Sequence, residues 1–344
     1  MFWCKRRSPQ PAEIRFIDDA PRPYVRTPAG ARPQPQPVVP PPVPPPTVKA
    51  VEVAPSPTAK PKKKSGRGVT LLTAMAVFGT GVYLKEQGAF NHGAKAQLTM
   101  PAQIFSVSEE PVIAIDAFDG PIEVTRGTSG RVEVSVIKEA SAKDQMRADA
   151  ELRQVTVTST GDDKKVTVTA TRGSGQKLGE SWVKVKVAAP ADSSLQLRTA
   201  NGEIRVGQVE GAIAAHTSNG AIKVNEARGQ LDLDTTNGRI TIDGEDVVVN
   251  AKTQSGGINF NGSLGEGESL FETTNGGVDV ELPSDQSFRI DAKTNRGRIR
   301  NEFRNIKHET NGKSDHRVIG VVGNHPQSEL KIRTSNGGIR VERD

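Results

Sequence analysis

Apolar and polar residues alternate with a period of two through much of the second half of the chain. Such alternation places the apolar side chains on one face of a β-strand. Seven short stretches each have two such alternating positions, and all fourteen positions except Ser269 are apolar. They are Leu195 and Leu197, Ile213 and Ala215, Leu231 and Leu233, Val249 and Ala251, Ser269 and Phe271, Ile290 and Ala292, and Leu330 and Ile332. Each pair predicts one short strand.

Each of these strands runs into the same phrase, T-x-N-G-x-I-x-V, whose Ile and Val predict a second strand. The seven copies have their glycines at steps of 18, 18, 18, 20, 21 and 40 residues. A fixed period of this size indicates stacked coils whose apolar faces join into one core. The sequence therefore predicts an all-β, single-domain β-solenoid with coils of 18–21 residues, and the last step indicates a degenerate coil or an insertion. A meander of Asn-Gly hairpins is the alternative.

The Asn-Gly pairs predict the corners between the two strands of each coil. Both residues tolerate positive φ, which allows a tight turn. Stacking would also place the asparagines in a column whose amides bond one another, interrupted by Ser255 and Arg296. The predicted corner residues are Asn201, Gly202, Asn219, Gly220, Asn237, Gly238, Ser255, Gly256, Asn275, Gly276, Gly297, Asn336 and Gly337. They are structural positions rather than catalytic ones.

A less regular region precedes these coils, and we expect it to cap the stack. Residues 116–124 echo the repeat, with Asp119 at the Asn position, so the domain is expected to span residues 104–344. A helix is predicted over Ala140 to Leu152, opened by Ser141 with Asp144 three residues on. A hairpin is predicted over residues 155–169, and a strand over residues 182–187.

Residues 1–67 have a different composition. They hold 17 of the 23 prolines, 15 of them between Pro21 and Pro61, and 13 Lys or Arg against 4 Asp or Glu. This segment is predicted to be a disordered, polyproline-rich basic tail, either a spacer or the site of a cytoplasmic partner. Because the rest of the chain has no basic excess and no aromatic platform interleaved with arginines, nucleic-acid binding is not expected.

Seventeen uncharged residues, 68–84, follow the basic tail and predict a membrane-spanning signal-anchor helix. Because Lys and Arg abut its amino end, the tail is placed in the cytoplasm and the later residues outside the inner membrane, in the periplasm or beyond. Residues 85–103 are expected to be a linker. Cleavage after Ala94-Lys-Ala96 is the competing outcome. Cys4 is the only cysteine, so no disulfide is expected.

The repeated phrase resembles that of the bacterial putative-adhesin domains of unknown function. These domains share a recurring T-x-N-G-x-[IV]-x-[VI], an Ala/Glu-rich helix after the first coil and a closing Leu-x-Leu-x-Thr-x-Asn-Gly-x-Ile, here matched by Leu330 to Ile339. The resemblance covers residues 105–341, departs at Ser255, Arg296 and residues 301–327, and implies a β-solenoid at an envelope surface.

Outward-facing residues form rows in a stacked sheet. One charged or His residue precedes each Thr, which predicts a ladder of cross-strand ion pairs rather than a binding surface. This row is Arg198, His216, Asp234, Lys252, Glu272, Lys293 and Arg333.

Catalytic and metal-binding patterns are weak in this sequence. Asp232 with Asp234, and Asp279 with Glu281, share strand faces, but neighbouring coils add no further acids. The spacing of His308, His316 and His325 beside Asp315 matches no usual zinc motif, so no metal or cofactor is expected.

The predicted function is a membrane-anchored, non-enzymatic module outside the cytoplasm that binds a glycan, another envelope polymer or a protein along the solenoid. The alternative is a polysaccharide lyase or hydrolase that acts in the solenoid groove.

Overall fold

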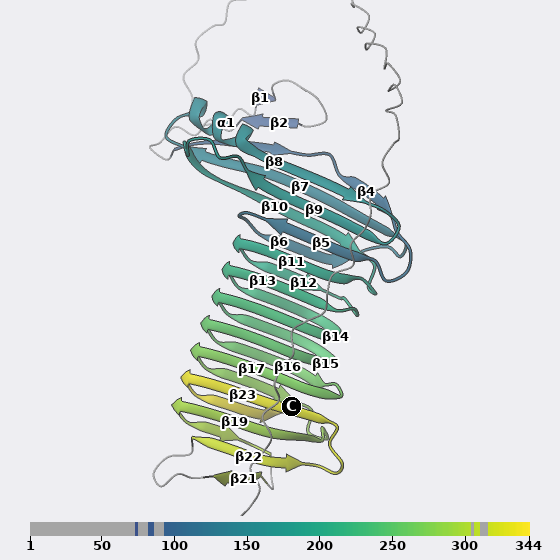
Figure 1. Ribbon diagram of the computed structural model, residues 1–344, viewed down its shortest axis with the longest axis vertical. Coiled ribbons are helices and arrows are strands. Elements are labelled where there is room, and N and C mark those ends of the chain that lie inside the picture. Colours follow the sequence, from purple (N-terminus) through teal and green to yellow (C-terminus); the bar gives the residue numbers. More distant parts are fainter. Residues whose placement is uncertain (1–72, 75–81, 86–92, 304–305, 310–315) are drawn as a thin grey trace, which may run out of the picture. The chain divides into compact units, whose positions relative to one another are not determined.

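The computed structural model describes residues 73–74, 82–85, 93–303, 306–309 and 316–344, which belong to one compact unit, Arg67–Asp344. In these residues the regular structure is β-strand except for helix α1 (Gln145–Gln154). The predicted all-β class is therefore confirmed. Figure 1 shows the strands stacked above one another.

Each regular coil has a first strand that ends at the Asn position and a second strand that begins at the Ile. The coils are built from β11 (Ser194–Asn201), β12 (Ile204–Gly207), β13 (Ile213–Asn219), β14 (Ile222–Asn237), β15 (Ile240–Ser255), β16 (Ile258–Leu264), β17 (Gly267–Asn275), β18 (Val278–Leu282), β19 (Phe288–Arg296), β20 (Ile299–Asn301), β23 (Ser328–Asn336) and β24 (Ile339–Arg343). β14 and β15 each continue from the second strand of one coil into the first strand of the next.

Neighbouring coils pair in parallel and in register. Ile204 lies opposite Ile222, which in turn lies opposite Ile240, and all three side chains are fully buried. A hairpin meander would pair these strands antiparallel, so the solenoid interpretation is the correct one. Both strands of each coil contribute to one continuous hydrophobic core that extends from Val107 to Val341.

The first layer of the stack is β5 (Val112–Ala117) and β6 (Ile122–Arg126), which pair in parallel with β11 and β12. The echo of the repeat around Asp119 therefore marks a true coil. Beyond it lie the remaining strands of the cap, which are β3 (Ala94–Thr99), β4 (Gln103–Ser106), β7 (Arg131–Ala142), β8 (Val155–Gly161), β9 (Lys165–Arg172) and β10 (Gly179–Ala189). The predicted hairpin is the antiparallel pair of β8 and β9, and the predicted strand at residues 182–187 lies in β10.

The helix starts later than predicted. Asp144, not Ser141, is its N-cap, and the Asp144 carboxylate accepts a hydrogen bond from the backbone N–H of Arg147 at 2.9 Å. Ser141 lies in β7, where it pairs with Lys95 and Glu180 of the two flanking strands. Pairing of β7 on both sides therefore overrides the helix propensity of residues 140–142.

The coils do not stack in chain order. β23 lies between β17 and β19, and β24 lies between β18 and β20, as Figure 1 shows for the first strands. The 40-residue step is therefore an insertion and not a degenerate coil. It carries β21 (Ile306–Glu309) and β22 (Arg317–Val322), which pair antiparallel, and β22 also pairs antiparallel with β19. These strands cover the far side of β19, so the chain must return to place residues 328–343 inside the stack.

The predicted tail, residues 1–67, lies outside the described residues, as does most of the predicted span 68–84. The described parts of that span belong to strands β1 (Thr73–Ala74) and β2 (Val82–Lys85), which pair antiparallel. The predicted linker over 85–103 is wrong in its later part, because β3 pairs with β7 and buries Ala96.

Among the described residues, we find no helix with the length and apolar character needed to cross a membrane.

Candidate functional site

The asparagine corners form the hydrogen-bonded column that the sequence predicts. Within it the Asn219 amide donates to Asn201 Oδ1 at 2.7 Å, and the Asn237 amide donates to Asn219 Oδ1 at 2.8 Å. Asn201 itself donates to Asp119 Oδ2 at 3.2 Å, so Asp119 extends the column into the first layer. These amides are engaged with each other along the stack, which makes the column a structural feature.

The glycines of these corners are needed for a reason other than the predicted one. Of the seven, only Gly297 has a positive φ, at 158° and close to extended, so the expected left-handed turn is absent. Instead, a Cβ atom at Gly220 would lie 1.9 Å from the carbonyl oxygen of Gly202, and at Gly238 it would lie 1.9 Å from that of Gly220. Close contact between coils therefore excludes any side chain here.

The buried Thr of the repeat has a role that the sequence analysis did not assign. Thr217 donates its hydroxyl hydrogen to the carbonyl oxygen of Gly202 at 3.1 Å, and Thr253 donates to that of Gly238 at 3.0 Å. The same bond recurs in every copy of the phrase. The signal was available, because an invariant polar residue in phase with the core requires a buried partner.

The charged row in front of these threonines lies in register, but the predicted ladder of ion pairs is wrong. In the part of the chain that the structure describes, no ion pair joins two neighbours of this row, and Arg333 pairs with Asp291 instead, at 2.5 Å. Exposed long side chains gain little from pairing in water, which accounts for the absence of the ladder.

The carboxylates considered for catalysis do not converge. Asp232 accepts a hydrogen bond from the Asn250 amide at 2.8 Å, and Asp234 lies opposite Lys252. Across the described ranges, no three His, Cys, Asp or Glu side chains are arranged to hold a metal ion. His316 and His325 lie in described segments, whereas Asp315 and the side chain of His308 lie outside them.

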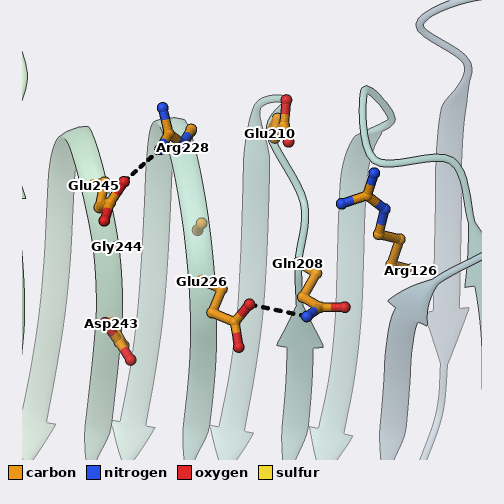
Figure 2. A pocket seen from close by; sticks show the side chains of 9 residues that line it. Arg126, Gln208, Glu210, Glu226, Arg228, Asp243, Gly244 and Glu245 are labelled. Atoms are coloured by element: carbon orange, nitrogen blue, oxygen red, sulfur yellow. Dashed lines mark hydrogen bonds and ion pairs between the residues drawn. The ribbon is translucent and has the colours of Figure 1, made fainter.

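A second set of corners, where the Ile-x-Val strands end, forms a groove that the sequence analysis missed. We call it the corner groove. Figure 2 shows its side chains rising from successive coils. Its volume is about 230 Å³, and it is lined by Arg126, Gln208, Glu210, Glu226, Ala227, Arg228, Asp243, Gly244 and Glu245.

Unusual backbone geometry shapes this corner. Gln208 and Glu226 have φ values of 60° and 52°, and Asp246, beside the groove, has a φ of 54°. The left-handed region costs a non-glycine residue roughly 1 kcal/mol or more. The chain turns here through residues with long polar side chains, which therefore project from equivalent positions on successive coils.

The polar groups of the corner groove are only partly paired. Gln208 donates its amide hydrogen to Glu226 Oε2 at 2.9 Å, and Arg228 forms an ion pair with Glu245, as the dashed lines in Figure 2 mark. Within the described chain, the side chains of Arg126, Glu210 and Asp243 have no hydrogen-bond or ion-pair partner. All of them are exposed.

The groove can therefore offer both hydrogen-bond acceptors and donors to a ligand. Four carboxylates, two guanidiniums and one amide line it, and none of the lining residues is aromatic or carries a nucleophilic hydroxyl or thiol. Such groups suit the hydroxyls of a polyhydroxylated molecule. The charged or amide residues after each Ile-x-Val, such as those at 208, 226 and 243, were the sequence signal for this site.

Residues 195–342 match the family model described as Toastrack DUF4097. No curated protein matches the chain. Among solved structures, a putative cell adhesion protein from Clostridium sporogenes is 11% identical, with 71% of this chain and 99% of that chain covered and a TM-score of 0.30. A putative adhesin from Bacteroides fragilis is 13% identical, with 70% and 96% covered and a TM-score of 0.27. A putative lipid binding protein from Parabacteroides distasonis is 12% identical, with 70% and 96% covered and a TM-score of 0.30.

Proposed function

We propose that this chain, whose residues 195–342 match the Toastrack DUF4097 family model, is a non-enzymatic module that binds a polyhydroxylated envelope polymer, such as a glycan, in the corner groove. The observation that carries the proposal is the set of unpaired polar groups there. Three of the lining side chains, those of Arg126, Glu210 and Asp243, come from different coils, and none of them forms a hydrogen bond with another group of the described residues.

The spacing of these groups favours an extended ligand. Neighbouring coils are separated by the distance between paired strands, about 4.8 Å. Polar side chains from the first layer, β12, β14 and β15 therefore follow one another along the stack, although a register shift after Val224 displaces those of β15. A polymer lying along this row would meet a new donor or acceptor on each coil, so weak single contacts would add up.

The absence of catalysis is part of this proposal. A polysaccharide lyase or hydrolase needs two or three carboxylates that converge on one bond, or on a metal beside a base. The four carboxylates of the groove are spread over three coils, with only Asp243 and Glu245 on the same strand, and Glu226 and Glu245 are already engaged by Gln208 and Arg228. We therefore expect binding without turnover.

We also propose that the apolar residues 68–84 anchor the chain in the inner membrane. The basic, proline-rich residues 1–67 would then lie in the cytoplasm, and the solenoid would lie outside it. This rests on the apolar run and its flanking charges. Protease added to intact cells and to spheroplasts tests it. Digestion of the solenoid only in spheroplasts is expected, and digestion of residues 1–67 from outside would contradict it.

The binding proposal is tested with the full-length chain in a neutral detergent and polysaccharide purified from the envelope. We expect the wild-type protein to bind the polysaccharide saturably and to release no reducing ends from it. The double variant Glu210→Gln, Asp243→Asn should lose most of this binding. The control is Asp234→Asn with Glu272→Gln, on the exposed row of the first strands. Product release, or equal losses in the two double variants, would contradict the proposal.

A further inference from the structure

A second hollow lies on another part of the solenoid, on the outer face of β18, β24 and β20. Its volume is about 370 Å³, and it is lined by Gly277, Asp279, Arg298, Arg300, Gly338, Ile339 and Arg340. It is formed where the returning coil of residues 328–343 lies between its two neighbours. Three guanidiniums and one carboxylate surround it, so the lining is cationic. We call it the arginine hollow.

Two of the three cations are not neutralised by the protein. Arg340 forms ion pairs with Asp279 at 3.6 Å and with Glu342 at 3.2 Å. In the described part of the chain, Arg298 and Arg300 have neither a hydrogen-bond nor an ion-pair partner. Arg300 also lies directly opposite Arg340 in the parallel register. Like charges at opposed positions destabilise a sheet, so this arrangement is not explained by stability.

Two glycines keep the hollow open although packing does not require them. A Cβ atom at Gly276 would lie 1.9 Å from a carbonyl oxygen of the neighbouring coil. At Gly277 and Gly338 the nearest atom would be 3.4 Å away, an ordinary contact, and neither residue has a positive φ. Earlier coils carry Glu203 and Arg239 at the same position of the repeat. A side chain is therefore tolerated here by the fold, and its absence leaves space beside the arginines.

We propose that the arginine hollow is a binding site for a phosphate group. Planar guanidiniums bind phosphate oxygens through paired, charge-assisted hydrogen bonds, and the lining has a surplus of two positive charges for a doubly charged oxyanion. The glycines allow the anion to approach the backbone between the coils. This site does not depend on the proposed function, because it shares no residue with the corner groove.

The test is calorimetric titration of the full-length chain in neutral detergent with inorganic phosphate, against chloride at equal ionic strength. We expect one saturable phosphate site in the wild type. Arg300→Gln and Arg298→Gln should each weaken it about tenfold, the effect of losing one charge-assisted hydrogen bond. Gly338→Ala should also weaken it, because the methyl group fills the hollow without touching the core.

The control is Arg205→Gln, at the position of the repeat that corresponds to Arg300 and Arg340 but outside the hollow. It should bind phosphate as the wild type does, and so should the groove variant Glu210→Gln, Asp243→Asn. A parallel titration with monomeric dihexanoylphosphatidylglycerol identifies the source. Tighter binding than inorganic phosphate, lost in Arg300→Gln, assigns a lipid headgroup, and weaker binding assigns a soluble phosphate. Phosphate heats no larger than those of chloride, or an equal loss in Arg205→Gln, would overturn the proposal.

Discussion

The hydroxyl of Thr235 donates a hydrogen bond to the carbonyl oxygen of Gly220, one coil away, at 3.0 Å. Thr235 is 1% exposed, so its hydroxyl cannot turn to water instead. The bond joins the first strand of one coil to the corner of the previous one. Because it recurs along the stack, it fixes how each corner sits on its neighbour.

Replacing this threonine by valine keeps its shape and removes the bond. Thr235→Val should destabilise the protein by about 1 to 2 kcal/mol, because the part-buried Gly220 carbonyl loses its hydrogen-bond donor. The midpoint of urea unfolding, followed by circular dichroism, measures this change. The adjacent exposed residue provides the control, and Thr236→Val should stay within about 0.5 kcal/mol of the wild type. Equal effects of the two variants would show that the hydroxyl contributes nothing.

The corner glycines should be more sensitive than the threonines. In Gly238→Ala the new methyl group would lie 1.9 Å from the Gly220 carbonyl oxygen, so the two coils must separate. We expect a loss of about 3 kcal/mol or more. Gly207→Ala is the matched change, since nothing lies within 4 Å of a Cβ atom there. It should be neutral or slightly stabilising in the same urea experiment.

The asparagine column should contribute less, because it is exposed. Asn219→Ala removes one amide bond to Asn201 and one from Asn237, and we expect a cost of about 1 kcal/mol. Ser218→Ala, next to it and also exposed, serves as the comparison. If Asn219→Ala unfolded at the urea concentration of Ser218→Ala, the column would have no energetic role.

A buried ion pair fixes the helix to the cap and predicts a pH dependence. Glu151 is fully buried and receives hydrogen bonds from Arg172 at 2.5 Å, from the backbone N–H of Leu178 at 2.9 Å and from Ser181 at 3.1 Å. The Arg172 bond is the main reason that the pKa of Glu151 is lowered from 4.5 to about 2.

Because this pKa is lowered by folding, the ionised pair stabilises the protein above pH 4.5, and the stabilisation is lost as the pH falls toward 2. Glu151→Gln leaves Arg172 without its carboxylate and should cost about 3 kcal/mol at pH 7. The difference in unfolding free energy between wild type and variant should shrink between pH 4.5 and pH 2. A difference that does not change with pH would contradict the assignment.

The order of the coils predicts an unusual effect of truncation. A stop codon at Ser328 removes β23 and β24, which contact β17 and β18 on one side and β19 and β20 on the other. The amide protons of β19 and β20 that face β23 and β24 should then lose protection in hydrogen exchange, whereas those of β19 that face β22 keep their partner strand. A stack in chain order would keep them protected. The cap strands β7 and β10 provide the internal reference and should exchange as before.

The sequence shows the coil, but not how the coils are ordered. Alternation around Leu195 and Ile204 fixes which faces are buried, and the 18-residue step fixes which residues stack, because both properties are local. Residues 328–343 could pair with the edge strands of several coils. Every coil has the same apolar pattern, so the periodicity does not predict which strands β23 pairs with.

Other differences have the same kind of cause. Ser141 was assigned to a helix start because local capping patterns ignore the pairing of β7 with two strands. The corner glycines were expected because glycine tolerates positive φ, whereas the structure requires them because neighbouring coils, 18 residues apart in the sequence, lie too close for a Cβ atom. The corner groove was missed because Glu226 and Asp243 look like ordinary solvated residues until stacking brings them together.

The intercalated coil also constrains how the rod can be assembled from a growing chain. Up to residue 282, each new coil can dock on the one before it as soon as it is synthesised. Residues 288–301 cannot do so, since their neighbour in the finished rod comes later in the chain. Docked early on β17 and β18, they would occupy the place of residues 328–343. Docking of one coil at a time therefore ends with the fifth regular coil, and the remaining strands must pair with the stack together in a final folding step.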